Sequence, residues 1–148
     1  MPIEWREIYE RYDLLFHWTP GGSRKHLPEL AQTVEQLIGQ GVVDFYVGHY
    51  GNFDRLAART VIAAKQRHPE VRLTMLLPYH PAEREVILPS GFDSSLYPPG
   101  MENVPRRFAI ARANRWMVEH CTHLVAYVTH PASNAGKVVE WGRRLTKE

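Results

Sequence analysis

Apolar residues along the chain recur at helical spacings in some stretches and form short unbroken runs in others. Spacings of three and four predict a helix that starts at Leu27 and ends at Gly39 or Gly41, and helices over Phe53–Arg67 and Arg106–His120. Unbroken apolar runs predict strands over Val42–Val47, Val71–Leu77 and His123–Val128. Because strands and helices alternate, we expect an α/β fold, a mostly parallel sheet with helices on both faces.

The remaining stretches are assigned less directly. Residues 1–11 have helical character, Tyr12–Trp18 is consistent with a short strand, and a last helix is expected from Gly136 to Leu145. Residues 79–105 are proline-rich and irregular. Because so long a loop is uncommon in a compact domain, we expect either a functional excursion or short elements that the pattern does not reveal.

Length and composition indicate one ordinary globular domain over residues 1–148, with 1–20 as an atypical N-terminal extension. The chain is 44% hydrophobic and 23% charged, and its net charge of +2 is too small to indicate nucleic-acid binding by itself. The single cysteine, Cys121, excludes an internal disulfide and fits a reducing compartment. With no apolar run of about 20 residues and no signal peptide, we expect a cytoplasmic protein without membrane contact.

The segment between the Val42–Val47 strand and the following helix is a glycine-containing turn. Such a turn directs unpaired backbone N–H groups and the positive end of the helix dipole at one spot, which suits a phosphate. The expected ligand-binding residues are Gly48, His49, Tyr50, Gly51 and Asn52. Turn chemistry alone is the alternative. Asp54 falls in the first helical turn, as a cap or as the acceptor of a ribose hydroxyl.

Ligands of parallel sheets bind beyond the carboxyl ends of the strands. Three loops qualify here: Gly48–Asn52, Pro78–Pro81 and Thr129–Gly136. In the last of them, Ser133 or Asn134 is expected to cap the final helix, Gly136 permits close backbone approach, and Lys137 can reach a phosphate. Glu140, one turn further, is placed either near the crevice or in a surface ion pair.

Arg112 and Arg115 are three residues apart and therefore share a helix face. Their guanidinium groups match the geometry of phosphate and carboxylate, so we expect them to recognise an anion. A solvated face with Glu119 as partner is the alternative. Metal binding is not expected, because only His120 and His123 are close in sequence and nothing completes a ligand set. Cys121 is expected to be a buried, inert thiol.

Several segments resemble a bacterial branch of the SLOG superfamily, which includes DprA, the LONELY GUY proteins and YpsA-like proteins. They are Tyr46-Val47-Gly48, Phe53-Asp54, Tyr97–Pro105, Asn114-Arg115-Trp116-Met117 and Tyr127–His130. The resemblance covers about residues 27–145. It implies a Rossmann-like sheet and a pocket for a nucleotide-derived ligand such as ADP-ribose, NAD or a nucleoside monophosphate, with Asn114 among the contacts.

The chain also departs from that pattern. Phe16-His17-Trp18 stands where relatives carry Gly-His-Arg, and Ser133-Asn134 stands where they carry a glycine pair. Of the residues that form the loop of the phosphoribohydrolases in this superfamily, only a glycine and a glutamate are matched at the same spacing here, by Gly136 and Glu140. These departures argue for a shared fold more than for shared catalysis.

Three functions follow as hypotheses. The first is binding of a nucleotide-derived small molecule, as in a sensor, with no cofactor. The second is N-glycosidic hydrolysis of nucleoside monophosphates, with Glu140 and Arg115 as catalytic residues. The third is single-stranded DNA binding through Arg106, Arg107, Arg112 and Arg115, against which the weak net charge counts. A homodimer is also expected, through apolar residues of the 79–105 stretch: Tyr79, Ile87, Phe92 and Tyr97.

Overall fold

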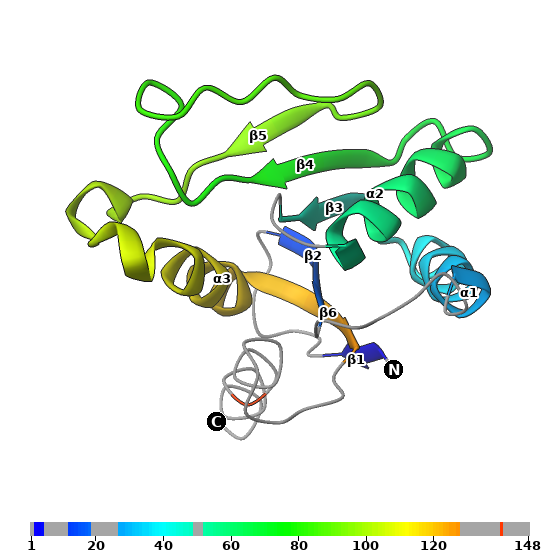
Figure 1. The fold of residues 1–148 in the computed structure, drawn as a ribbon. Coiled ribbons are helices and arrows are strands. Elements are labelled where there is room, and N and C mark those ends of the chain that lie inside the picture. The colour runs from blue at the N-terminus through cyan, green and yellow to red at the C-terminus, as the bar shows by residue number, and fades with distance from the viewer. Residues whose placement is uncertain (1, 5–11, 19–26, 49–51, 128–139, 141–148) are drawn as a thin grey trace.

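The computed structural model of the chain describes residues 2–4, 12–18, 27–48, 52–127 and 140. Six strands form one sheet in the order β1-β6-β2-β3-β4-β5 (Figure 1). Their bounds are β1 Pro2–Glu4, β2 Tyr12–Trp18, β3 Asp44–Val47, β4 Arg72–Leu76, β5 Ser94–Leu96 and β6 Cys121–Tyr127. The five neighbouring strands β6, β2, β3, β4 and β5 are parallel to one another. β1 pairs antiparallel with β6 at the edge of the sheet. The expected α/β fold with a mostly parallel sheet is confirmed.

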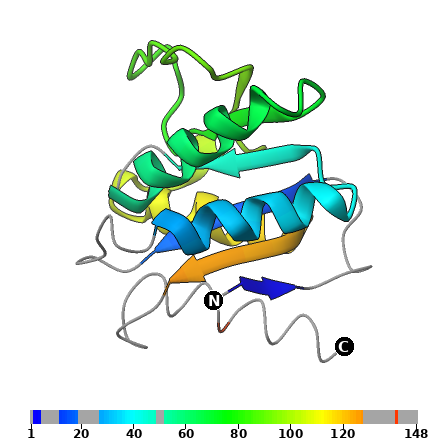
Figure 2. The same cartoon turned by 90° about the vertical axis from the view of Figure 1, so that its right-hand side faces the viewer.

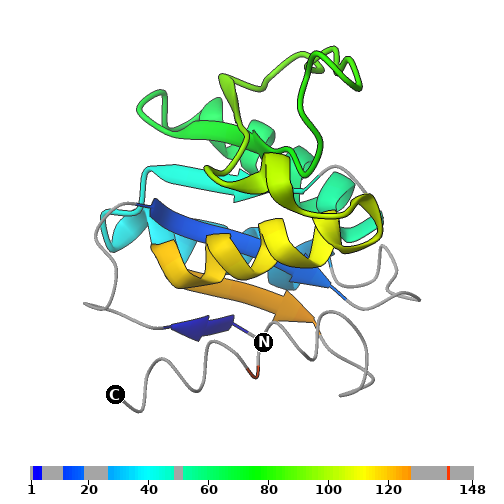
Figure 3. The same cartoon turned by 90° about the vertical axis from the view of Figure 1, so that its left-hand side faces the viewer.

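Three α-helices cover the sheet. α1 (Leu27–Gly39) and α2 (Asn52–Lys65) lie on one face (Figure 2), and α3 (Ala109–His120) lies on the other (Figure 3). Two single-turn 3₁₀ helices, η2 (Met101–Asn103) and η3 (Arg106–Phe108), precede α3. None of the helices in the described ranges is long and apolar enough to cross a membrane.

The sequence pattern located most of these elements, with two exceptions. Helical character was expected for residues 1–11, but residues 2–4 form a strand whose Ile3 is the register partner of Leu124. Within the 79–105 stretch the structure contains β5, a short element that the apolar pattern did not reveal. The helix expected at Gly136–Leu145 lies outside the described residues, apart from Glu140.

The alternation of side chains along the strands divides the core into two halves. Phe45 and Val47 of β3 pack with α1, α2 and Leu73 of β4 on one face. Tyr46, between them in sequence, packs with α3 and with Leu76 and Leu124 on the other face. Both faces of β3 are therefore covered, which explains why it reads as a continuous apolar run.

Asp93 fixes the middle of the 79–105 stretch to the sheet. Its Oδ2 accepts hydrogen bonds from Lys65 Nζ of α2 at 2.6 Å and from the Leu73 N–H at 2.8 Å, while Lys65 Nζ also donates to the Gly91 carbonyl at 2.8 Å. Beside it, the hydroxyls of Thr74 and Ser94 are 2.8 Å apart, at paired positions of β4 and β5. These polar contacts hold β5 against β4.

Candidate functional site

The chain reverses its direction across the sheet between β2 and β6. From β2 it passes through α1 to β3 and through α2 to β4, on one face, and after β5 it returns through α3 to β6 on the other face. Strands β2 and β6 are thus neighbours, β2 followed by a helix on one face and β6 preceded by a helix on the other, with Trp18 beside Tyr127 at their carboxyl ends. Such a reversal is where parallel α/β sheets bind ligands.

The strand order decides which loops share this edge. The carboxyl ends of β6, β2, β3 and β4 follow one another along one edge of the sheet, so the three segments that the sequence singled out all start from that edge. β2 ends at the same edge with Trp18, so the segment that follows Trp18 starts there as well, which the sequence analysis did not take into account. The sequence signal for a loop was the composition of Thr19-Pro20-Gly21-Gly22-Ser23. That this segment belongs to the candidate site follows only from the central position of β2 in the sheet.

Asp54 is the described polar side chain most closely tied to this edge. It lies in the first turn of α2, and its Oδ1 accepts a hydrogen bond from the backbone N–H of Gly48 at 3.3 Å. Gly48 directly follows the last residue of β3, so the carboxylate is held at the carboxyl end of that strand. Asp54 is partly exposed, and its charge is favoured by the N-terminus of α2.

This contact changes the interpretation of the glycine turn. The Gly48 amide was expected to donate to a phosphate, but in the structure it donates to a carboxylate. A phosphate placed on the same N–H would meet the like charge of Asp54. The geometry therefore favours a ligand that presents hydroxyl donors at this position.

Other predicted contacts around this edge lie partly outside the described residues. His49, Tyr50, Gly51, Ser133, Asn134, Gly136 and Lys137 belong to segments that the structure does not describe. Asn52 is the first residue of α2. Glu140 is exposed.

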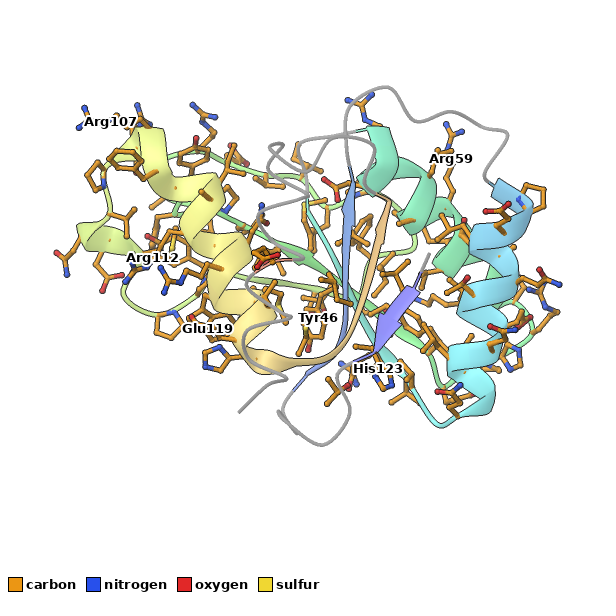
Figure 4. All side chains as sticks on the ribbon, turned by 90° about the horizontal axis from the view of Figure 1, so that it is seen from below. Tyr46, Arg59, Arg107, Arg112, Glu119 and His123 are labelled. Carbon is orange, nitrogen blue, oxygen red and sulfur yellow. The ribbon has the colours of Figure 1, made fainter. Side chains whose placement is uncertain are left out.

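The predicted arginine pair lies on α3, across the sheet from α2. Arg112 and Arg115 are exposed, and Asn114 between them is half-buried. Figure 4 shows Arg112 on the α3 side of the molecule and Arg59, of α2, on the opposite side. α3 leads directly into the amino end of β6 and runs antiparallel to it, so the helix begins near the carboxyl edge of the sheet. Arg112, three residues from that beginning, is closer to the edge than Arg115.

The two preceding arginines are engaged within the chain. Arg106 Nη2 pairs with Glu83 Oε1 at 2.6 Å, and the guanidinium of Arg107 lies over the Phe108 ring at 4.8 Å from its centroid. Both residues are exposed. They form a short basic surface with a neighbouring acidic group rather than an isolated basic patch.

The histidines that raised the question of a metal are engaged in local contacts. The His120 ring stacks on Trp116 with centroids 4.1 Å apart, and its Nδ1 is 2.6 Å from the Trp116 carbonyl oxygen. His123 Nδ1 is 2.8 Å from the Thr122 hydroxyl. Within the described ranges, no three His, Cys, Asp or Glu residues are grouped so as to hold a metal ion. Cys121 is buried, as expected for an inert thiol.

Comparisons of this chain with protein-family models, with curated proteins and with solved structures give no match.

Proposed function

We propose that the protein binds a nucleotide-derived small molecule at the carboxyl ends of β6, β2 and β3, and acts as a sensor of that molecule. The observation that carries the proposal is the Asp54 carboxylate, held at the carboxyl end of β3 by the Gly48 amide. It stands one strand away from the reversal between β2 and β6. Ligands with ribose, such as ADP-ribose, NAD or a nucleoside monophosphate, fit this arrangement.

The chemistry of a carboxylate selects the part of the ligand that it contacts. An ionised carboxylate only accepts hydrogen bonds, and the vicinal hydroxyls of ribose are paired donors. In doubly wound sheets an acidic side chain near the crevice takes this role. The phosphate is then expected away from Asp54, because like charges repel. Of the two arginines predicted from the sequence, Arg112 is the nearer partner for it.

The test is a thermal-unfolding panel with matched sugars. AMP, ADP-ribose and NAD are compared with 2′-deoxy-AMP at millimolar concentration. A ligand present at a hundred times its dissociation constant stabilises the folded state by about 2.7 kcal/mol, which raises the melting temperature by several degrees. We expect a rise with at least one ribonucleotide and a smaller rise with 2′-deoxy-AMP.

Asp54→Asn tests whether the carboxylate is responsible. The asparagine oxygen can still accept from the Gly48 N–H, so the fold is kept while the charge is removed. We expect weaker ribonucleotide binding and a smaller preference for ribose. Glu70→Gln is the matched control, because Glu70 is exposed and precedes β4 at the opposite edge of the sheet. A panel without any shift, or an unchanged ribose preference in Asp54→Asn, contradicts the proposal.

A further inference from the structure

A groove of about 390 Å³ runs between α1 and α2 on the outer surface of their layer. Small apolar side chains dominate its lining: Ala31 of α1 with Leu56, Ala63 and Ala64 of α2. Arg59 and Arg67 also line it. A groove with an apolar floor and basic groups fits an apolar side chain that is accompanied by an acidic one.

The two arginines differ in their partners. Arg67 donates to Glu35 Oε1 of α1 from both Nε and Nη2, at 2.9 and 2.8 Å. Arg59 is exposed and makes no ion pair with any residue that the structure describes. The charge available to a partner is therefore that of Arg59.

The segment around Ile87 has the complementary chemistry. Ile87 is 84% exposed, which is extreme for a large apolar side chain. Exposure alternates along the segment: Glu85 and Ile87 are exposed, whereas Val86 and Leu88 are half-buried. Glu85 and Ile87 thus project together from the surface, and Glu85 has no ion-pair partner among the described residues.

We propose that the segment of a second copy of this chain docks in the groove, with Ile87 on Ala63 and Glu85 paired with Arg59. The spacings agree. Arg59 and Ala63 are four residues apart on α2, about 6 Å along the helix. Residues two apart in an extended segment are separated by about 7 Å. The engagement of Arg67 with Glu35 fixes the direction, because Glu85 finds an unpaired cation only on the Arg59 side.

This contact concerns self-association and is independent of the ligand. If each of two copies docks its segment in the groove of the other, the result is a closed dimer. If only one of the two contacts forms, a groove and a segment stay free to bind further copies, and an open assembly grows. Both forms depend on the same two residue pairs. The molar mass in solution distinguishes them.

The experiment measures that mass by analytical ultracentrifugation over a range of protein concentrations. We expect wild type to self-associate. Ile87→Ser and Arg59→Glu should each weaken association by about tenfold to a hundredfold, the effect of losing one buried apolar anchor or one charge-assisted contact. Arg55→Glu is the matched control, because it makes the same charge change one turn earlier on α2, outside the groove lining.

Charge reversal of both partners provides the decisive comparison. Arg59→Glu and Glu85→Arg should each weaken association, and the double variant should recover most of the wild-type affinity. The substituted residues, Arg55, Arg59, Glu85 and Ile87, are all exposed, and thermal unfolding verifies that each variant is folded. A monomeric wild type at 100 µM, association that survives Ile87→Ser and Arg59→Glu, or a double variant no better than the singles overturns the proposal.

Discussion

Gly48 leaves the room that the Asp54 carboxylate occupies: a Cβ atom at Gly48 would lie 2.9 Å from Asp54 Oδ2 and 3.3 Å from its Cγ. Real Cβ atoms do not approach that closely. A side chain at residue 48 is therefore compatible only with a shifted Asp54 carboxylate. The contact between Gly48 and Asp54 links the end of β3 to the first turn of α2.

The first prediction follows from this contact. Gly48→Ala should displace the carboxylate and break its hydrogen bond with residue 48, at a cost of about 1 kcal/mol in the free energy of unfolding. It should also weaken ribonucleotide binding. Urea unfolding and the ligand panel measure the two effects. Gly39→Ala is the control, because no atom lies within 4 Å of a Cβ there and alanine favours the end of α1.

The sequence predicted the helices and the buried strands because these elements have strong apolar patterns. Val42–Val47 and Val71–Leu77 contain the strands β3 and β4, each buried on both faces. β5 was missed because Ser94-Ser95-Leu96 has no such pattern. Its pairing depends on Asp93 and on the Thr74–Ser94 contact, which join residues twenty positions apart. β1 was misread because the apolar side chains of residues 1–11 have a helical spacing, whereas pairing with β6 determines the structure of residues 2–4.

The candidate site was predictable only in part for a similar reason. The glycine turn and Asp54 were visible in the sequence, but their mutual contact was not. Whether a loop lies at the reversal depends on strand order, and this order arises from pairing between β2 and β6, more than a hundred residues apart. The three-residue spacing likewise placed Arg112 and Arg115 on one helix face, but it did not show which of them is nearer the strand ends.

Asp93 provides a prediction about pH. Burial raises the pKa of its carboxyl, but hydrogen bonds from Lys65 and the Leu73 N–H outweigh this and hold the pKa below the ordinary value of 3.8. Because the folded-state pKa is lowered, the ionised group stabilises the protein above pH 3.8, and this contribution is lost as the pH falls through the folded-state pKa.

Asp93→Asn should therefore destabilise the protein by about 1 kcal/mol at pH 7, a modest value because the side chain is partly exposed and screened by solvent. The difference from wild type should shrink as the pH falls from 3.8 through the lower folded-state pKa, below which Asp93 of the folded wild type is neutral. Urea unfolding at a series of pH values measures it, with Glu102→Gln as an exposed control. A difference that is constant with pH contradicts the assignment.

Two glycines with the same φ allow the cost of backbone strain to be measured separately from the cost of steric overlap. Gly91 and Gly41 both have φ of 100°. A Cβ at Gly91 would lie 2.7 Å from Ile62 Cδ1, whereas a Cβ at Gly41 meets nothing within 4 Å. Gly41→Ala should cost about 1–2 kcal/mol from backbone strain alone. Gly91→Ala should cost measurably more in the same unfolding assay, because Ile62 must also move. Equal costs show that Ile62 yields freely.

The last prediction concerns the arginines of α3. Arg112 follows the start of the helix by three residues and Arg115 by six, or about 4.5 and 9 Å along the axis. Because α3 starts near the carboxyl edge of the sheet, Arg112 is the better placed of the two to pair with a ligand phosphate there. Arg112→Ala should weaken nucleotide binding by about tenfold to a hundredfold, and Arg115→Ala by less. Titration of each variant with the ribonucleotide that stabilises wild type measures this. If Arg115→Ala has the larger effect, the phosphate lies further along α3 than the strand ends, and if neither variant weakens binding, the anion is held by groups outside α3.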